Sequence, residues 1–163
     1  MKKNSLTLFV IMFFALSSVF SQINTYGELL VSTKENVKPA LGFGLKYLHP
    51  INNGLFLGGN IGYRQTISSD YFGGQIPIMA IGRYYVNQDE NGFYPQASLG
   101  LVYSFSRIKV LNSNIKSSST NFGFNIGAGY KIDDQYDIGL LFENITYENG
   151  SSSAFIIRLA YTF

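Results

Sequence analysis

The stretch "NFGFNIGAGYKI", residues 121–132, decides the fold because its two alternating faces differ in both polarity and size. One face holds the bulky apolar residues Phe122, Phe124, Ile126 and Tyr130. The other face holds the small, amide or charged residues Asn121, Gly123, Asn125, Gly127, Gly129 and Lys131. An alternation with a period of two indicates a β-strand with different surroundings on its two sides. Since the apolar face is also the bulky one, it suits a lipid-facing surface better than a narrow interior.

The same alternation recurs along the chain and predicts eight strands. Their ranges are residues 26–32, 38–49, 55–66, 75–86, 93–105, 121–132, 136–147 and 154–163. Compact turn signals occur at residues 50–54, 87–92 and 133–135. Longer, mostly polar connections occur at residues 33–37, 67–74, 106–120 and 148–153. This order predicts an all-β, eight-stranded antiparallel up-and-down barrel with both chain ends on the tight-turn side.

The direction in which the faces point decides the class of barrel. Eight strands leave an interior that side chains just fill, so the small and polar face fits the lumen. Aromatic residues gather near both ends of the strands: Tyr47, Tyr84, Phe93, Tyr130, Tyr136, Tyr161 and Phe163 at the tight turns, and Tyr63, Tyr103, Phe105 and Phe122 at the loops. Two such belts are typical of a transmembrane β-barrel. A soluble, secreted, lipocalin-like barrel that binds a ligand inside is the alternative.

Residues 1–21 have the features of a secretory signal peptide, which leaves residues 22–163 as the barrel domain. Lys2 and Lys3 precede a short apolar run, and small residues precede a cleavage point after Ser21. Removing the two lysines lowers Lys+Arg from 12 to 10 against 10 Asp+Glu, so the mature chain is formally neutral. This balance predicts no nucleic-acid partner. The absence of cysteine excludes disulfides and thiolate metal sites.

With these features the chain resembles the small eight-stranded outer-membrane β-barrel proteins of Gram-negative envelopes, the group around the membrane domain of outer-membrane protein A. The marks are the signal peptide, the eight segments, "IPIMAIGRYYV" at residues 76–86 and the closing "LAYTF" at residues 159–163. The resemblance implies a location in the cell outer membrane. It also implies that Tyr161 and Phe163 form the signal that the barrel-assembly machinery recognises, although Phe163 could equally be a belt residue.

An outward apolar face places eight charged residues in the lumen. They are five bases and three acids: Glu28, Lys46, Arg64, Arg83, Lys131, Asp137, Glu143 and Arg158. We expect them to pair and to hold the barrel together as a plug, because an unpaired charge in a poorly hydrated interior is costly. A narrow conducting path lined by charge is the alternative, although eight strands leave little room for it.

The longest connection, "SRIKVLNSNIKSSST" at residues 106–120, is basic. It contains Arg107, Lys109 and Lys116 and no acidic residue, and part of it has strand character. We expect the two flanking strands to continue beyond the membrane here and to present an exposed edge with positive charge. Such an edge could pair with a partner strand or lie against anionic lipopolysaccharide.

No catalytic or cofactor site is predicted. The single histidine, His49, lies beside the turn at residues 50–54 and is expected to be solvated rather than a catalytic base. We therefore expect a monomeric, non-enzymatic integral outer-membrane barrel with no cofactor and with a structural or surface-interaction role through its extracellular loops. Its expected partners are outer-membrane lipid, lipopolysaccharide and the barrel-assembly machinery. A narrow pore or transport protein is the alternative function.

Overall fold

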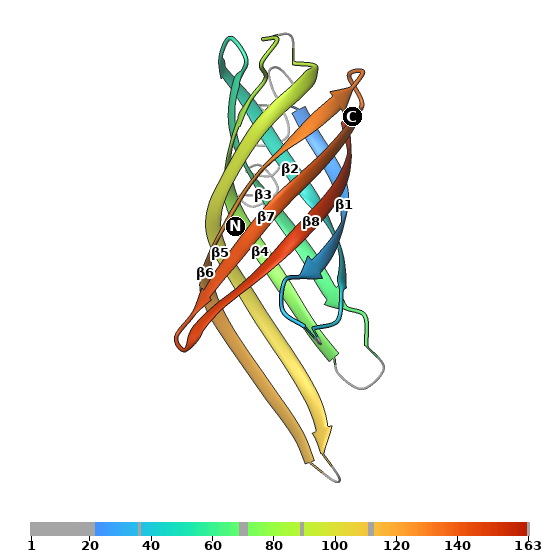
Figure 1. Cartoon of the computed structure of the whole chain (residues 1–163), viewed down its shortest axis with the longest axis vertical. Helices are drawn as coiled ribbons and strands as arrows, with labels where there is room; N and C mark the ends of the chain where they lie inside the picture. The colour runs from blue at the N-terminus through green and yellow to red at the C-terminus, as the bar shows by residue number, and fades with distance from the viewer. Residues whose placement is uncertain (1–21, 36, 69–71, 89, 111–112, 163) are drawn as a thin grey trace, which may run out of the picture.

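The computed structural model describes residues 22–35, 37–68, 72–88, 90–110 and 113–162, so the predicted signal peptide and Phe163 lie outside the described part. Eight antiparallel strands form one closed barrel, in which sequence neighbours pair and β1 also pairs with β8 (Figure 1). The strands are β1 (Gln22–Ser32), β2 (Ala40–Asn52), β3 (Leu55–Thr66), β4 (Phe72–Tyr84), β5 (Gly92–Val110), β6 (Ser113–Ile132), β7 (Tyr136–Tyr147) and β8 (Gly150–Thr162). The predicted all-β, eight-stranded antiparallel barrel is confirmed.

The two ends of the barrel differ. At the tight-turn end, β2 continues through Pro50 to Asn52, so only Asn53 and Gly54 connect it to β3. Gly54 has a φ of 78°, a left-handed conformation that glycine adopts without a steric penalty. The opposite end, called the loop end below, carries the connections from β1 to β2, β3 to β4, β5 to β6 and β7 to β8. The predicted loop at residues 148–153 is wrong, because β8 begins at Gly150 and pairs back to Tyr147.

The β5–β6 hairpin projects past the other strands at the loop end (Figure 1). Its pairing runs without a break from Gly92 opposite Lys131 to Val110 opposite Ser113. The expected continuation of these strands is therefore confirmed. Pairing between β6 and β7 begins only at Phe122, so among the described residues the stretch of β6 before it has β5 on one side and no strand on the other.

The exterior of the barrel is apolar. The most exposed large side chains include Leu140, Leu159, Ile126 and Phe43, which are 58%, 60%, 57% and 66% exposed. They alternate with buried inward residues along each strand, as in β7 and β8. A surface of this kind is compatible with lipid and not with water, so the predicted outward apolar face is confirmed. In the described part of the chain, no helix has the length and hydropathy needed to cross a membrane.

The sequence interpretation expected the interior to be lined by small and polar residues. The structure shows that the lumen also contains buried apolar side chains. One buried apolar cluster consists of Leu48, Phe56, Ile81, Tyr85 and Tyr94. Two others are formed by Leu30, Leu141 and Ile156, and by Met79, Val102 and Ile145. Together with the buried polar side chains of β6, such as Asn125, these clusters fill the lumen with side chains from all eight strands, as expected for a barrel of this size.

Candidate functional site in the lumen and at the loop end

All eight charged residues predicted for the lumen are buried, with 1–5% of each residue exposed. They come from β1, β2, β3, β4, β6, β7 and β8 and separate into two groups. We call the first the Arg64 group; its members are Glu28, Arg64, Glu143 and Arg158. We call the second the Asp137 group; its ion-pairing members are Lys46, Arg83 and Asp137.

The Arg64 group joins opposite walls of the barrel. Arg64 donates from Nη1 and Nη2 to the two carboxylate oxygens of Glu143, at 2.7 and 3.0 Å. Its Nε donates to Glu28 Oε1 at 2.6 Å. Arg158 donates from Nε and Nη2 to Glu28 Oε2, at 3.0 and 2.7 Å. Two acids and two bases thus neutralise one another, with the bidentate geometry that gives strong charge-assisted hydrogen bonds.

The Asp137 group gathers cations around one carboxylate. Lys46 Nζ and Arg83 Nη1 both donate to Asp137 Oδ2, at 2.9 and 2.8 Å, and the Tyr94 hydroxyl donates to Oδ1. Arg83 also donates to Gln96 Oε1 and to the Tyr85 hydroxyl. This group therefore has one more basic side chain than acidic side chains, and Gln96, Tyr85 and Tyr94 complete its hydrogen bonds.

Lys131 is the remaining lumen charge and is buried. In the pairing of β6 with β7 it is directly opposite Asp137. Lys131 thus extends the positive side of the Asp137 group toward the tight-turn end.

Two inward tyrosines, which sequence reasoning missed, each lie against a pair of glycines. Tyr26 on β1 is in register with Gly44 on β2, which is in register with Gly62 on β3. A Cβ atom added at either glycine would collide with the Tyr26 hydroxyl. An arginine covers the same ring, with Arg158 Cζ 4.5 Å from the ring centroid. The glycines therefore make room for a cation–π pair inside the barrel.

The same arrangement occurs again four strands further round. Tyr94 on β5 is in register with Gly129 on β6, which is in register with Gly139 on β7. Arg83 Cζ lies 3.7 Å from the Tyr94 ring centroid. The correspondence extends to the arginine partners: Arg158 is opposite Glu28, two residues after Tyr26, and Arg83 is opposite Gln96, two residues after Tyr94. The signal in the sequence was a pair of inward glycines on adjacent strands beside an inward tyrosine.

At the loop end, aromatic rings form a continuous outward band centred on Phe105. Its ring centroid lies 6.3 Å from Tyr63, 6.2 Å from Phe72 and 6.0 Å from Tyr103, and Tyr63 in turn lies 5.8 Å from Phe43. The tight-turn end has its own outward aromatic residues, including a Tyr136–Tyr161 contact at 5.4 Å. Both predicted belts therefore lie on the outer surface, although Phe163 is outside the described residues.

The predicted loop cations lie on the projecting hairpin. Arg107 on β5 is directly opposite Lys116 on β6, and both are exposed. Lys109 is opposite Asn114 in the same hairpin, and its side chain is outside the described part. His49 is an exposed residue near the tight turn between β2 and β3. Groups of three or more potential metal ligands do not occur in the described part of the chain.

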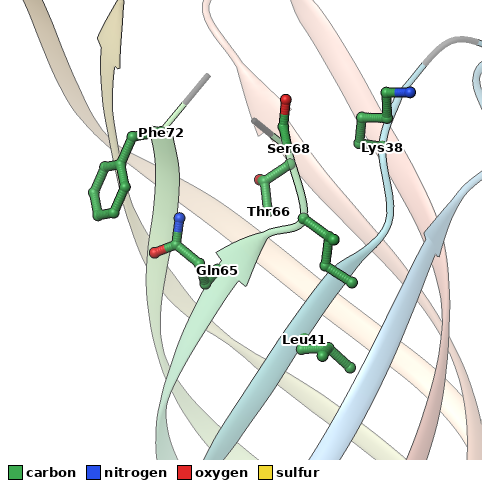
Figure 2. Close-up of a pocket in the computed structure, with 7 residues that line it drawn as sticks. Lys38, Leu41, Gln65, Thr66, Ser68 and Phe72 are labelled. Carbon is green, nitrogen blue, oxygen red and sulfur yellow. The ribbon is translucent and has the colours of Figure 1, made fainter. Parts of the chain in front are cut away.

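An open hollow lies outside the barrel where β2, β3 and β4 meet the loop end. Figure 2 shows its lining residues, with Lys38 on one side and Gln65 and Phe72 on the other. Leu41, Thr66, Ile67 and Ser68 complete the lining. None of these residues belongs to the two buried charge groups, so the hollow is a feature of the outer rim and not an entrance to the ion pairs.

Comparisons with known proteins identify the fold. No protein-family model matches the chain, and no curated protein matches it in sequence. Among solved structures, the attachment invasion locus protein Ail of Yersinia pestis has a TM-score of 0.69 at 15% identity, covering 88% of this chain and 97% of that one. The N-terminal β-barrel domain of Pseudomonas aeruginosa OprF has a TM-score of 0.67 at 14% identity, covering 87% and 97%.

Neisserial surface protein A has a TM-score of 0.54 at 14% identity, covering 88% of this chain and 96% of its own. The fold of this chain is therefore that of the small eight-stranded outer-membrane β-barrels, as the sequence resemblance implied. Together with the apolar exterior, this makes the protein an integral membrane β-barrel of the outer-membrane type.

Proposed function

We propose that this protein is a sealed, non-enzymatic barrel of the outer membrane that acts through the surface presented at its loop end. The observation that carries this proposal is the Arg64–Glu143 pair. It links β3 to β7, which lie four strands apart in an eight-stranded barrel, and so spans the lumen. Buried apolar clusters fill the space around it. A lumen crossed by ion pairs and packed with side chains supports a structural interior rather than a solute path.

The second candidate is a narrow pore. It is favoured by the excess of base over acid in the Asp137 group, since a one-signed lining attracts counter-ions. The two candidates predict different electrical behaviour. Purified, folded protein in planar bilayers should show no steady conductance if the barrel is sealed. Steady channels would favour the pore. If the Arg64→Gln or Arg83→Gln substitution also changed the ion selectivity of these channels, the pore would be established and the proposal overturned.

The β5–β6 hairpin supports the surface role. It carries Arg107 and Lys116 beside the aromatic band, and within the described part of the chain the stretch of β6 before Phe122 has an unpaired main-chain edge. An unpaired edge can add a strand from a partner protein. The structural neighbour Ail has been solved with the heparin analogue sucrose octasulfate, so a barrel of this fold can present an anion-binding surface. Both properties support a hairpin that mediates contact outside the membrane.

A truncated hairpin tests the surface role. Arg107 and Lys116 are direct partners, so replacing residues 108–115 with Asn-Gly joins them through a two-residue turn. We expect the shortened protein to fold and to insert as well as the wild type, because the barrel pairing is untouched. Cells that display it should adhere less to protein-coated surfaces than cells that display the full hairpin, because the truncation removes the projecting tip with Lys109 and the first residues of the unpaired β6 edge. Equal adhesion at equal surface levels would contradict the proposed role of the hairpin.

A further inference from the structure

Arg107 and Lys116 form a like-charge pair on the outward face of the hairpin. They are direct cross-strand partners in an uninterrupted register, so their side chains leave the same face of the sheet side by side. Both are exposed, and within the described part of the chain neither side chain has an ion pair. Like charges directly opposite one another destabilise a strand pair. An anion placed between them would remove this repulsion.

An open hollow adjoins the two cations. Its volume is about 630 Å³, and its lining includes Phe72, Tyr103, Phe105, Arg107 and Lys116. Phe105 precedes Arg107 by two residues, so the aromatic side of the hollow and the cationic side belong to one face of β5. The hollow is therefore amphipathic, with rings toward the membrane belt and positive charge toward the outside.

Gly74 helps to build the aromatic side. It is directly opposite Phe105, and a Cβ atom added there would lie 3.1 Å or less from three atoms of the Phe105 ring. The missing side chain lets this ring lie over β4, where it also contacts Phe72 at 6.2 Å between centroids. The rings thus form a fixed wall that is continuous with the loop-end belt.

We propose that this hollow binds a phosphorylated lipid of the membrane leaflet at the loop end, with the phosphate between Arg107 and Lys116 and the adjoining apolar part against Phe72, Tyr103 and Phe105. The proposal rests on the proposed membrane placement of the loop end. A lipid fits better than a soluble polyanion, because only a lipid uses the aromatic wall together with the charges. Basic residues at an anionic membrane surface each contribute to attraction of this kind.

Native mass spectrometry of the detergent-purified protein titrated with lipid A tests the proposal. The Arg107→Gln/Lys116→Gln variant should bind lipid A roughly thirtyfold more weakly than the wild type. Phe105→Ala should also weaken lipid A binding. A matched control is Lys34→Gln/Lys38→Gln, which removes two other exposed loop-end cations and should bind as the wild type does. Dephosphorylated lipid A should bind weakly to all variants.

Two further measurements separate the alternatives. Sucrose octasulfate serves as a soluble polyanion without an apolar part. If it binds as tightly as lipid A, and if Phe105→Ala does not change lipid A binding, the hollow is a general anion site. The lipid proposal then fails. Equal lipid A binding by wild type and by Arg107→Gln/Lys116→Gln also overturns it. The truncated hairpin keeps Arg107 and Lys116, so it should still bind lipid A although the cells that display it adhere less. Lipid A binding therefore tests this proposal, and cell adhesion separately tests the surface role of the hairpin.

Discussion

Arg64 and Glu143 face each other from opposite walls of the barrel and are joined by two hydrogen bonds, at 2.7 and 3.0 Å. Arg64 also holds Glu28, so one guanidinium compensates two buried carboxylates. We therefore expect the stability of the barrel to depend on this side chain more than on any surface charge.

Arg64→Met should lower the free energy of unfolding by about 3–5 kcal/mol, because it leaves Glu143 buried without its cation. The chain has no tryptophan, so unfolding in lipid vesicles is best followed by urea titration with gel mobility of unheated samples. The control is Lys38→Met at an exposed position, which should stay within about 0.5 kcal/mol of the wild type. A loss for Arg64→Met no larger than for the control would mean that the ion pairs do not support the fold.

Leu140→Arg should cost roughly 2–4 kcal/mol if the residue lies near the bilayer midplane, because a charge there faces lipid. Leu140 is 58% exposed on the outer face of β7. Leu140→Ala should be milder, since it removes apolar surface without adding charge. Both variants are compared by refolding into lipid vesicles, and equal tolerance of arginine and alanine would contradict a lipid-facing surface.

Gly129→Ala should destabilise the barrel by about 1–3 kcal/mol, because the added methyl group would collide with the Tyr94 hydroxyl and force the ring away from Asp137. Gly82→Ala is the matched control. Its added Cβ would meet only Leu57 Cδ2, at 3.6 Å, which is an ordinary contact. Urea titration gives the free energy of unfolding of each variant. Similar values for the two variants would show that the Tyr94 ring can move without a loss of stability.

Deletion of Phe163 should lower the amount of protein inserted in the outer membrane of cells more than it lowers refolding into detergent. The reason is that the last strand, with its alternating residues Tyr161 and Phe163, resembles the signal that the barrel-assembly machinery recognises. Fractionated membranes and detergent refolding yields give the two measurements. Normal insertion in cells would make Phe163 a belt residue only.

The sequence predicted the barrel, the outward face and the eight buried charges, because each follows from alternation within a single strand. β7 is the clearest case: its predicted range agrees with the structure from Tyr136 to Tyr147. The predicted extension of β5 and β6 followed from the strand character of residues 108–111 in the same way. Local pattern was sufficient wherever one strand carried the whole signal.

The sequence predicted which strands are neighbours but not which residues lie opposite one another, because that depends on the register of each pair. Nothing local places Arg64 between Glu28 and Glu143, which lie 36 and 79 residues away in the chain. The first strand was predicted from Tyr26, whereas β1 begins at Gln22, since pairing with β2 and β8 orders residues that alternate weakly. Tyr94 was missed for the same reason: its position over Gly129 exists only once β5 and β6 are aligned.

The repeated Arg–Tyr–Gly–Gly arrangement gives the barrel an approximate two-fold axis. The first copy uses β8, β1, β2 and β3, and the second uses β4, β5, β6 and β7, so each copy occupies half of the circumference. A rotation by four strands therefore brings each arginine, tyrosine and glycine pair onto the strands of its counterpart. Glu28 and Gln96 occupy equivalent places in this repeat, so the two halves of the lumen differ in charge at that position.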